Sequence, residues 1–313
     1  MTDPTMAQTN AVGVVSDDLR TAVRAAVARR SDWHGLLWFA RHLALAAAAA
    51  TGVVASDNPV WLATTLWLLG LTLVTLFAPL HECIHSTAFK HRGLNRVVAA
   101  ICGTVLLISP TWFRAFHFNH HRYTQDPDRD PELMRAKPRT RWQYVRHLSG
   151  LPTWYAAIST LLRLAVRRER PPWLTRRELH QASIEARAGL ALYVGLAAFA
   201  PSVFLAWAAA LLLGEPLRRA WLMAEHTGCA LAPDMWRNTR TVTSLPLLRM
   251  LTWQMGYHNV HHAWPGVPFH ALPAIDALVA ERTVERESGY IVTHQALYDA
   301  LADRAANASL QDS

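Results

Sequence analysis

Charged residues and cysteines are both scarce in this chain. Of its 313 residues, 17% are charged and 51% are hydrophobic, whereas soluble domains carry about 25% charged residues. The three cysteines, Cys83, Cys102 and Cys229, form no CxxC pair, which excludes a disulfide scaffold and a thiolate metal site. The sequence also lacks a glycine-rich dinucleotide fingerprint. We therefore expect a membrane protein without a redox domain of its own.

Long uncharged runs predict membrane spans. Residues 60–80 carry no charge, and at about 1.5 Å per residue this run crosses a hydrocarbon core of roughly 30 Å. An apolar stretch at 36–55 precedes it across a short turn, so the two form a hairpin. A second hairpin is expected over 182–224, turning near Pro201, although Glu215, Arg218 and Arg219 lie in its second arm.

The remaining segments are polar or only partly apolar. Residues 97–113 form an uncharged run that Pro110 breaks, and we interpret it as re-entrant or interfacial. Residues 114–148 predict a soluble cap, and 148–166 an amphipathic helix on the membrane surface. Residues 1–30 show no signal-peptide pattern and predict a partly disordered cytoplasmic tail. The membrane domain is then 31–273, and 274–313 form a charged helical tail.

Arginine and lysine set the expected orientation. Arg29 and Arg30 precede the first hairpin and Lys90 and Arg92 follow it, so the positive-inside rule places both of its ends in the cytoplasm. The predicted fold class is an all-α, multi-pass integral membrane protein, with about four transmembrane helices in two hairpins and a histidine-rich cytoplasmic cap. Its expected location is a bacterial inner membrane. The net charge of +8 is interpreted as an orientation signal and docking surface rather than as nucleic-acid affinity.

Histidine is unusually abundant, and nine of the 16 histidines gather in short motifs. These motifs are one HxxxH box, two HxxHH boxes and one histidine that ends the second hairpin: His81, His85, His117, His120, His121, His226, His258, His261 and His262. Residues three or four apart share a helix face, so each box can converge on one point. Each motif lies where an apolar segment meets a polar one, which places all nine on the cytoplasmic side.

This number of clustered imidazoles predicts a metal site. Imidazole suits iron, zinc, copper and nickel, and nine ligands exceed what one ion uses. Two ions that share the set are the economical interpretation. Activation of dioxygen by a pair of iron ions is a function that such a site could serve.

The order of the boxes is similar to that in the membrane fatty acid desaturase superfamily. The contexts HHRYTQDP at 120–127 and YHNVHHAWPGVP at 257–268 are similar to the extended second and third boxes of that family, and the resemblance covers about residues 36–273. It implies that the nine histidines ligate two iron ions and that O2 is the co-substrate. It also implies a lipid or fatty acyl substrate and a separate electron donor, ferredoxin-like or similar, on the basic face.

Two departures from the family narrow this prediction. The acyl-CoA Δ9 desaturases have one more residue in the first box, and they have Asn where this chain has Leu222. An acyl-lipid desaturase is therefore favoured, while a hydroxylase, ketolase or oxidative decarboxylase of a lipid or hydrocarbon stays open. No side chain outside the metal centre is assigned a catalytic role. Glu82, Glu225 and Asp126 are predicted to orient the ligand imidazoles.

Two other classes of protein share parts of this pattern. Residues 81–85 read HECIH and match the HExxH signature of zinc proteases, but a protease leaves seven clustered histidines unexplained. A metal transporter would place its site near the bilayer midplane, whereas these motifs lie at the ends of spans. A measured content of one zinc per chain would favour the protease. Metal uptake into vesicles that contain the protein would favour the transporter.

Overall fold

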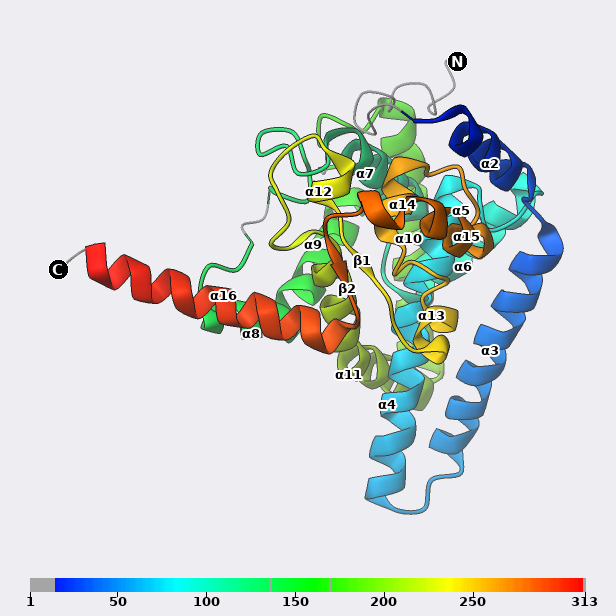
Figure 1. The fold of residues 1–313 in the computed structure, drawn as a ribbon. Helices are drawn as coiled ribbons and strands as arrows, with labels where there is room; N and C mark the ends of the chain where they lie inside the picture. Colours follow the sequence, from blue (N-terminus) through cyan, green and yellow to red (C-terminus); the bar gives the residue numbers. More distant parts are fainter. Residues whose placement is uncertain (1–14, 135–136, 169, 312–313) are drawn as a thin grey trace.

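The computed structural model describes residues 15–311 except 135–136 and 169. Within them the chain is mostly helical (Figure 1). The sheet found among the described residues is a parallel pair of two-residue strands, β1 (Thr241–Val242) and β2 (Arg286–Glu287). Three helices are long and apolar enough to cross a membrane, or up to four if a bent pair counts as one span. The predicted all-α membrane class is confirmed.

The first predicted hairpin is present and carries the first histidine box. It consists of α3 (Asp32–Val54) and α4 (Pro59–Thr75), and α4 continues into α5 (Phe77–His85) after a break at Leu76. Asn58 caps α4 by accepting from the Trp61 backbone N–H, and Pro59 occupies the first helical position. The combined span has 27 residues, about 40 Å at 1.5 Å per residue, which exceeds a hydrocarbon core of roughly 30 Å. The end that carries the histidines can therefore project beyond the core.

The second hairpin turns where the sequence predicted. α10 (Arg176–Phe199) begins with a capping box between Thr175 and Glu178, and it ends one residue before α11 (Pro201–His226). α10 qualifies as a span by its composition, whereas α11 is not among the three candidate spans. α11 packs along α4 and also contacts α10, so it completes the hairpin.

The uncharged run at 97–113 is sharply bent. It is divided between α6 (Arg92–Val105) and α7 (Pro110–Tyr123), whose axes differ by 98°. Gly103 permits the reversal, because a Cβ at this position would lie 2.5 Å from the Ile108 carbonyl oxygen. Such a bend fits the predicted re-entrant or interfacial segment.

Shorter helices build the cap around the ends of these spans. α2 packs against α15, although residues 1–30 were expected to be a partly disordered tail. That expectation lies outside the described residues for 1–14. In the described part of this segment, α2 is folded and buries Leu19, Val23 and Ala26 in the main hydrophobic core. The remaining elements are α2 (Asp17–Ala28), α8 (Arg141–Leu148), α9 (Leu151–Ala165), α12 (Met235–Asn238), α13 (Pro246–Leu251), α14 (His258–Ala263), η1 (Phe269–Ala271), α15 (Leu272–Val279), η2 (Ala280–Arg282) and α16 (Tyr290–Gln311).

Candidate metal centre

The nine predicted histidines are brought together from four helices. α5 carries the first box at its C-terminal end, α7 carries the second, α11 ends on His226, and the third box forms most of α14. All nine are buried except His85, which is partly exposed. Four helix ends that meet at one point therefore create a layer of imidazoles inside the cap.

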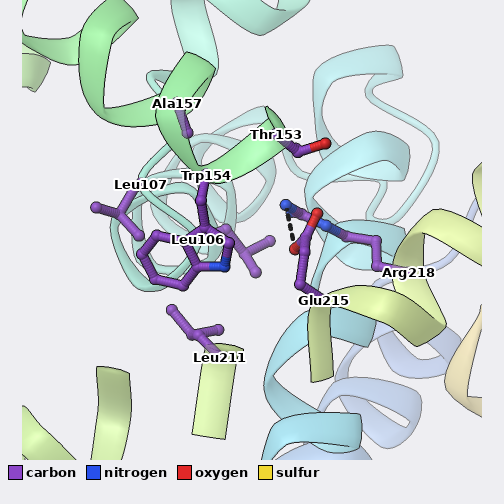
Figure 2. Close-up of a pocket in the computed structure, with 8 residues that line it drawn as sticks. All are labelled: Leu106, Leu107, Thr153, Trp154, Ala157, Leu211, Glu215 and Arg218. Carbon is purple, nitrogen blue, oxygen red and sulfur yellow. Dashed lines mark ion pairs between the residues drawn. The ribbon is translucent and has the colours of Figure 1, made fainter. Parts of the chain in front are cut away.

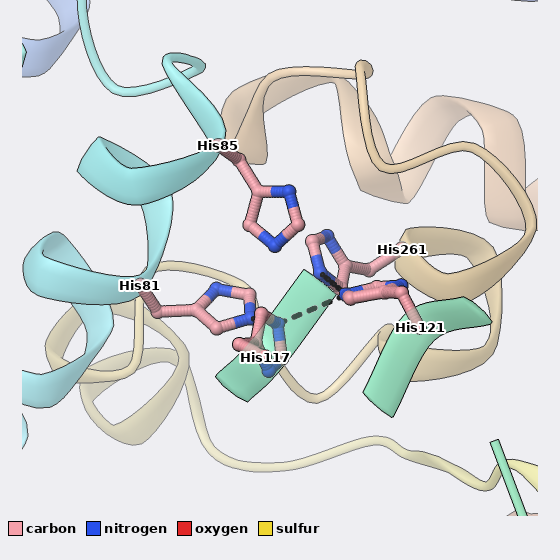
Figure 3. A group of neighbouring side chains, drawn as sticks. All are labelled: His81, His85, His117, His121 and His261. Atoms are coloured by element: carbon pink, nitrogen blue, oxygen red, sulfur yellow. Dashed lines mark hydrogen bonds between the residues drawn. The ribbon is translucent and has the colours of Figure 1, made fainter. Parts of the chain in front are cut away.

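Five histidines form one group (Figure 3). The Nε2 atom of His117 lies 2.8 Å from Nε2 of His81 and 2.9 Å from Nε2 of His121. Nε2 of His261 lies 3.1 Å from Nε2 of His121. The fifth member, His85, has a buried Nε2 with no hydrogen-bond partner among the described residues. One ligand atom from each of the five lies within 4.8 Å of the others.

The other four histidines form a second group beside the first. Nε2 of His226 lies 3.2 Å from Nε2 of His120 and 3.1 Å from Nε2 of His258. Nε2 of His262 lies 3.1 Å from Nε2 of His258. The rings of His121 and His262 stack with their centroids 4.1 Å apart, so the two groups are in direct contact.

The spacing of these nitrogens fits metal coordination. Imidazole nitrogens bind zinc at about 2.0–2.1 Å, and two nitrogens at right angles around an ion at that distance lie about 3 Å apart. The six Nε2 to Nε2 distances within the groups range from 2.8 to 3.2 Å. Each group therefore has the donor atoms and the spacing to hold one ion.

Helical periodicity explains how each HxxHH box serves both groups. Residues four apart lie on nearly the same face of a helix, and a residue three positions on lies on a neighbouring face. In α7, His117 and His121 accordingly join the five-histidine group while His120 joins the other. In α14 the division is reversed: Nε2 of His258 lies 3.1 Å from Nε2 of both His226 and His262 in the four-histidine group, while His261 belongs to the five-histidine group.

Hydrogen bonds at Nδ1 prepare three members of the four-histidine group as ligands. Nδ1 of His120 lies 2.9 Å from the Asp130 carboxylate, and Nδ1 of His226 lies 3.1 Å from the Asn238 carbonyl oxygen. Both oxygens are acceptors, so each Nδ1 must carry the proton and each Nε2 keeps its lone pair. Nδ1 of His262 lies 3.2 Å from the hydroxyl of Thr124, which itself donates to a backbone carbonyl.

The three predicted orienting carboxylates differ in their contacts. Glu82 accepts from the Thr87 hydroxyl and the Phe269 backbone N–H, and its other oxygen lies 3.7 Å from Nδ1 of His81. Oε1 of Glu225 lies 3.5 Å from Nδ1 of His258. Glu225 therefore contacts this imidazole rather than that of His226, the next residue in the sequence.

The third predicted carboxylate contacts no imidazole. Asp126 pairs with Arg129 on the surface of the 126–130 turn. In the same turn, Asp130 is the acidic residue that contacts a histidine. The prediction therefore named the wrong aspartate of this turn, because sequence spacing does not show which carboxylate faces an imidazole.

Burial favours the neutral, ligand form of the third box. Loss of hydration, followed by the proximity of other imidazoles, lowers the pKa of His258, His261 and His262 well below the usual value near 6.5. A neutral imidazole is the form that binds metal. At neutral pH these three side chains are therefore ready to coordinate a cation.

Two contacts in the centre carry no sequence signal. The acceptor for His226 is the backbone carbonyl of Asn238, an atom that every residue type provides. The side chain of Gln125 donates to the backbone carbonyl of His226, which fixes the end of α11 over the site. Only the folded arrangement identifies these supporting groups.

These features define a membrane protein with a buried multi-histidine metal site at the ends of its spans. A family model described as fatty acid desaturase matches residues 58–294, which includes every histidine of both groups. The chain belongs to the fatty acid desaturase family. It is therefore a membrane oxidoreductase of the desaturase or hydroxylase kind and depends on oxygen.

Proteins similar to this chain are named for several different activities. The sphingolipid delta(4)-desaturase DES1 of Drosophila melanogaster is 27% identical over 281 residues, covering 86% of this chain and 81% of the relative. The sn-1 oleoyl-lipid 12-desaturase of Picosynechococcus sp. is 27% identical over 135 residues, 41% of this chain and 39% of the relative. The beta-carotene ketolase of Haematococcus lacustris is 23% identical over 207 residues, 63% of this chain and 57% of the relative.

Proposed function

We propose that this protein is a di-iron enzyme that oxidises a lipid acyl chain, with the nine clustered histidines as iron ligands. The observation that carries the proposal is the division of the nine into two contacting groups with ligand nitrogens about 3 Å apart. Imidazole ligands without thiolates suit iron among other metals. The match to the desaturase family favours iron over zinc.

Bound iron would supply the chemistry that side chains lack, because an unactivated C–H bond has no acidic proton for a protein base. Desaturation combines the acyl chain, O2, two electrons and two protons to give a double bond and two waters. Hydroxylation consumes the same reagents and gives an alcohol and one water. The protein's own part is to hold the imidazoles in their ligand tautomers through Asp130, Thr124 and the Asn238 carbonyl, and to keep the centre buried.

An acyl-lipid desaturase is the favoured activity. The two desaturases described above act on lipids that their names give as a sphingolipid and an oleoyl-lipid. The likeness to a beta-carotene ketolase keeps an oxygen-inserting activity as the second candidate.

We propose that a separate donor supplies the two electrons. The two histidine groups are the candidate metal sites among the described residues, and the chain carries a net charge of +8. An acidic protein such as a ferredoxin fits a basic docking face. We place that face and the metal centre on the cytoplasmic side of a bacterial inner membrane, because basic residues flank the first hairpin.

Metal analysis together with lipid mass spectrometry tests this function. The chain is expressed in a bacterial host, its metal content is measured after purification, and host lipids are compared with those from a His121→Ala chain. We expect close to two irons per chain and a new lipid product that the variant lacks. His180→Ala is the matched control, because His180 is an exposed residue that contacts Arg167 rather than the metal centre.

Three outcomes would contradict the proposal. Full iron occupancy and activity in the His121→Ala chain would show that the ligand assignment is wrong. One zinc per chain would favour the HExxH protease. Metal uptake into vesicles without oxidation of lipid under reductant and oxygen would favour a transporter.

A further inference from the structure

A buried ion pair lies in α11 on the membrane side of the metal centre. Nη2 of Arg218 lies 2.7 Å from Oε2 of Glu215, and the two residues are 7% and 3% exposed. Arg218 precedes His226 by eight residues, or about 12 Å along a helix. Charged residues at such a position are costly and usually functional.

The pair keeps unused hydrogen-bonding capacity. Nε and Nη1 of Arg218 and Oε1 of Glu215 are buried without a partner among the described residues. A buried donor or acceptor left unpaired costs about 1–3 kcal/mol, and more when it is charged. The two side chains therefore offer at least one donor and one acceptor to a further group.

These side chains line a small cavity (Figure 2). Its volume is about 10 Å³, which is room for about one water-sized group. The α6–α7 turn, α9 and α11 form its wall, which is apolar apart from the ion pair and Thr153: Leu106, Leu107, Trp154, Ala157 and Leu211. Gly150, at the start of α9, packs directly on Glu215, since a Cβ there would lie 2.2 Å from its Cγ.

One aromatic ring connects this cavity to the metal centre. The guanidinium carbon of Arg218 lies 5.7 Å from the ring centroid of Phe77, and that ring lies 6.4 Å from the imidazole of His81. The Phe77 ring therefore lies between the ion pair and the five-histidine group, and a carbon chain attached to a polar group at the ion pair would pass this ring to reach the metal centre.

We propose that the Glu215–Arg218 cavity binds the neutral polar group, a hydroxyl, of the lipid that the metal centre oxidises. Such a group both donates and accepts, so it can satisfy Glu215 and Arg218 together. A carboxylate would meet the negative charge of Glu215, a phosphate is too large for the cavity, and a plain hydrocarbon would leave Nε and Nη1 of Arg218 and Oε1 of Glu215 without partners. The proposal rests on the proposed function only in taking a lipid as the substrate.

Ligand binding to the purified full-length chain in detergent tests this assignment without requiring turnover. The probes are N-hexadecanoyl ethanolamine, its O-methyl ether and hexadecanoate, and binding is measured from the rise in melting temperature with ligand concentration. We expect the ethanolamide to bind about tenfold more tightly than its ether, because the ether cannot donate its hydroxyl proton to Glu215. Hexadecanoate should bind more weakly than the ethanolamide.

Removing both charges should abolish this preference. A double variant, Glu215→Leu with Arg218→Met, replaces a buried ion pair by apolar side chains, a change that often preserves folding. Its affinities for the ethanolamide and the ether should become equal. Glu215→Gln keeps the side-chain shape, and it should lose the discrimination against hexadecanoate.

The control variant is Arg146→Gln. Arg146 is exposed and lines a separate hollow of about 610 Å³ that α9 also borders. We expect this variant to keep the preference of the unmodified chain. If Arg146→Gln removes the preference and the double variant retains it, the lipid binds in the outer hollow and the assignment is overturned.

Equal binding of all three probes by the unmodified chain would show that the cavity holds water only. Failure of the proposed function is distinguishable from this result. It would appear as a lack of iron or of oxidised lipid, whereas the preference among the probes is measured without turnover.

Discussion

The imidazole of His120 and the carboxylate of Asp130 form a buried pair, with Nδ1 of His120 2.9 Å from Oδ1 of Asp130. The carboxylate also accepts the backbone N–H groups of Gln125, at 2.8 Å, and Glu132, at 2.9 Å. These bonds hold the carboxylate in place, so it fixes both the tautomer and the direction of the imidazole. His120 thereby presents Nε2 to the four-histidine group.

Replacing Asp130 by Asn should weaken metal binding. The amide is a poorer acceptor for Nδ1–H, and loss of such a supporting contact typically costs 10- to 100-fold in metal affinity or activity. Asp126→Asn is the matched control, because Asp126 contacts Arg129 rather than an imidazole. Competition with a chelator measures the iron affinity of both variants. An equal loss in the two would show that the turn, not the Asp130 contact, supports the site.

The two histidine groups should lose metal separately. His226→Ala removes a ligand of the four-histidine group, and His85→Ala removes one of the five-histidine group. Because the groups use different nitrogens, we expect each variant to keep about one of two irons, with the loss in a different group. Iron per chain, with Mössbauer spectra of the remaining ion, distinguishes the two variants. Complete loss of iron in both would show that the groups bind only as one unit.

Helical periodicity made much of this site predictable from sequence. The HxxxH and HxxHH spacings and the apolar runs before them were sufficient to place nine histidines in one layer, since both depend on local geometry. The supporting contacts depend on tertiary packing. Glu225 lies on a helix face that brings its carboxylate to His258 rather than to its neighbour His226. Backbone acceptors such as the Asn238 carbonyl leave no trace in a sequence.

For the fold, the sequence predicted the breaks between helices but not every helix. The turn near Pro201 and the bend before Pro110 were predictable, because proline disfavours helix in the residue that precedes it. The helix α2 was missed although its buried residues Leu19, Val23 and Ala26 have helical spacing, because a helix of 12 residues is marginal alone and depends on packing against α15. In the sequence, Glu215 and Arg218 indicated only that the second arm of the hairpin is a poor membrane span. In the structure they form an ion pair.

Close backbone contact between α4 and α11 should make Gly70 intolerant of any side chain. A Cβ at Gly70 would lie 2.2 Å from the Ala210 carbonyl oxygen, whereas nothing lies within 4 Å of a Cβ at Gly195. Gly70→Ala should destabilise the protein by about 1–3 kcal/mol through overpacking. The same substitution at Gly195 should be neutral or stabilising by up to about 1 kcal/mol, because alanine is the better helix former. Melting temperatures in detergent compare the two, and similar values would rule out tight packing at this crossing.

Acid should destabilise the cap partly through His270, a histidine outside both metal groups. Its ring stacks on His34 with centroids 4.3 Å apart, and burial, together with His34 and Arg29, lowers the pKa of His270 to about 4. The unfolded chain has a histidine pKa near 6.5, so below that pH it binds a proton that the folded chain refuses. The stability contributed by neutral His270 is therefore complete above pH about 6.5 and is lost progressively as the pH falls toward about 4.

His270→Gln removes the proton-binding group while keeping a polar side chain. The fall in melting temperature between pH 7 and pH 5 should be smaller in this variant than in the unmodified chain, because one source of proton uptake on unfolding is absent. His91→Gln is the control, since His91 is an exposed histidine, and its acid sensitivity should equal that of the unmodified chain. The buried metal-site histidines are the same in all three proteins, so their contribution cancels in the comparison. An unchanged fall in His270→Gln would mean that His270 protonates in the folded state as readily as in the unfolded state.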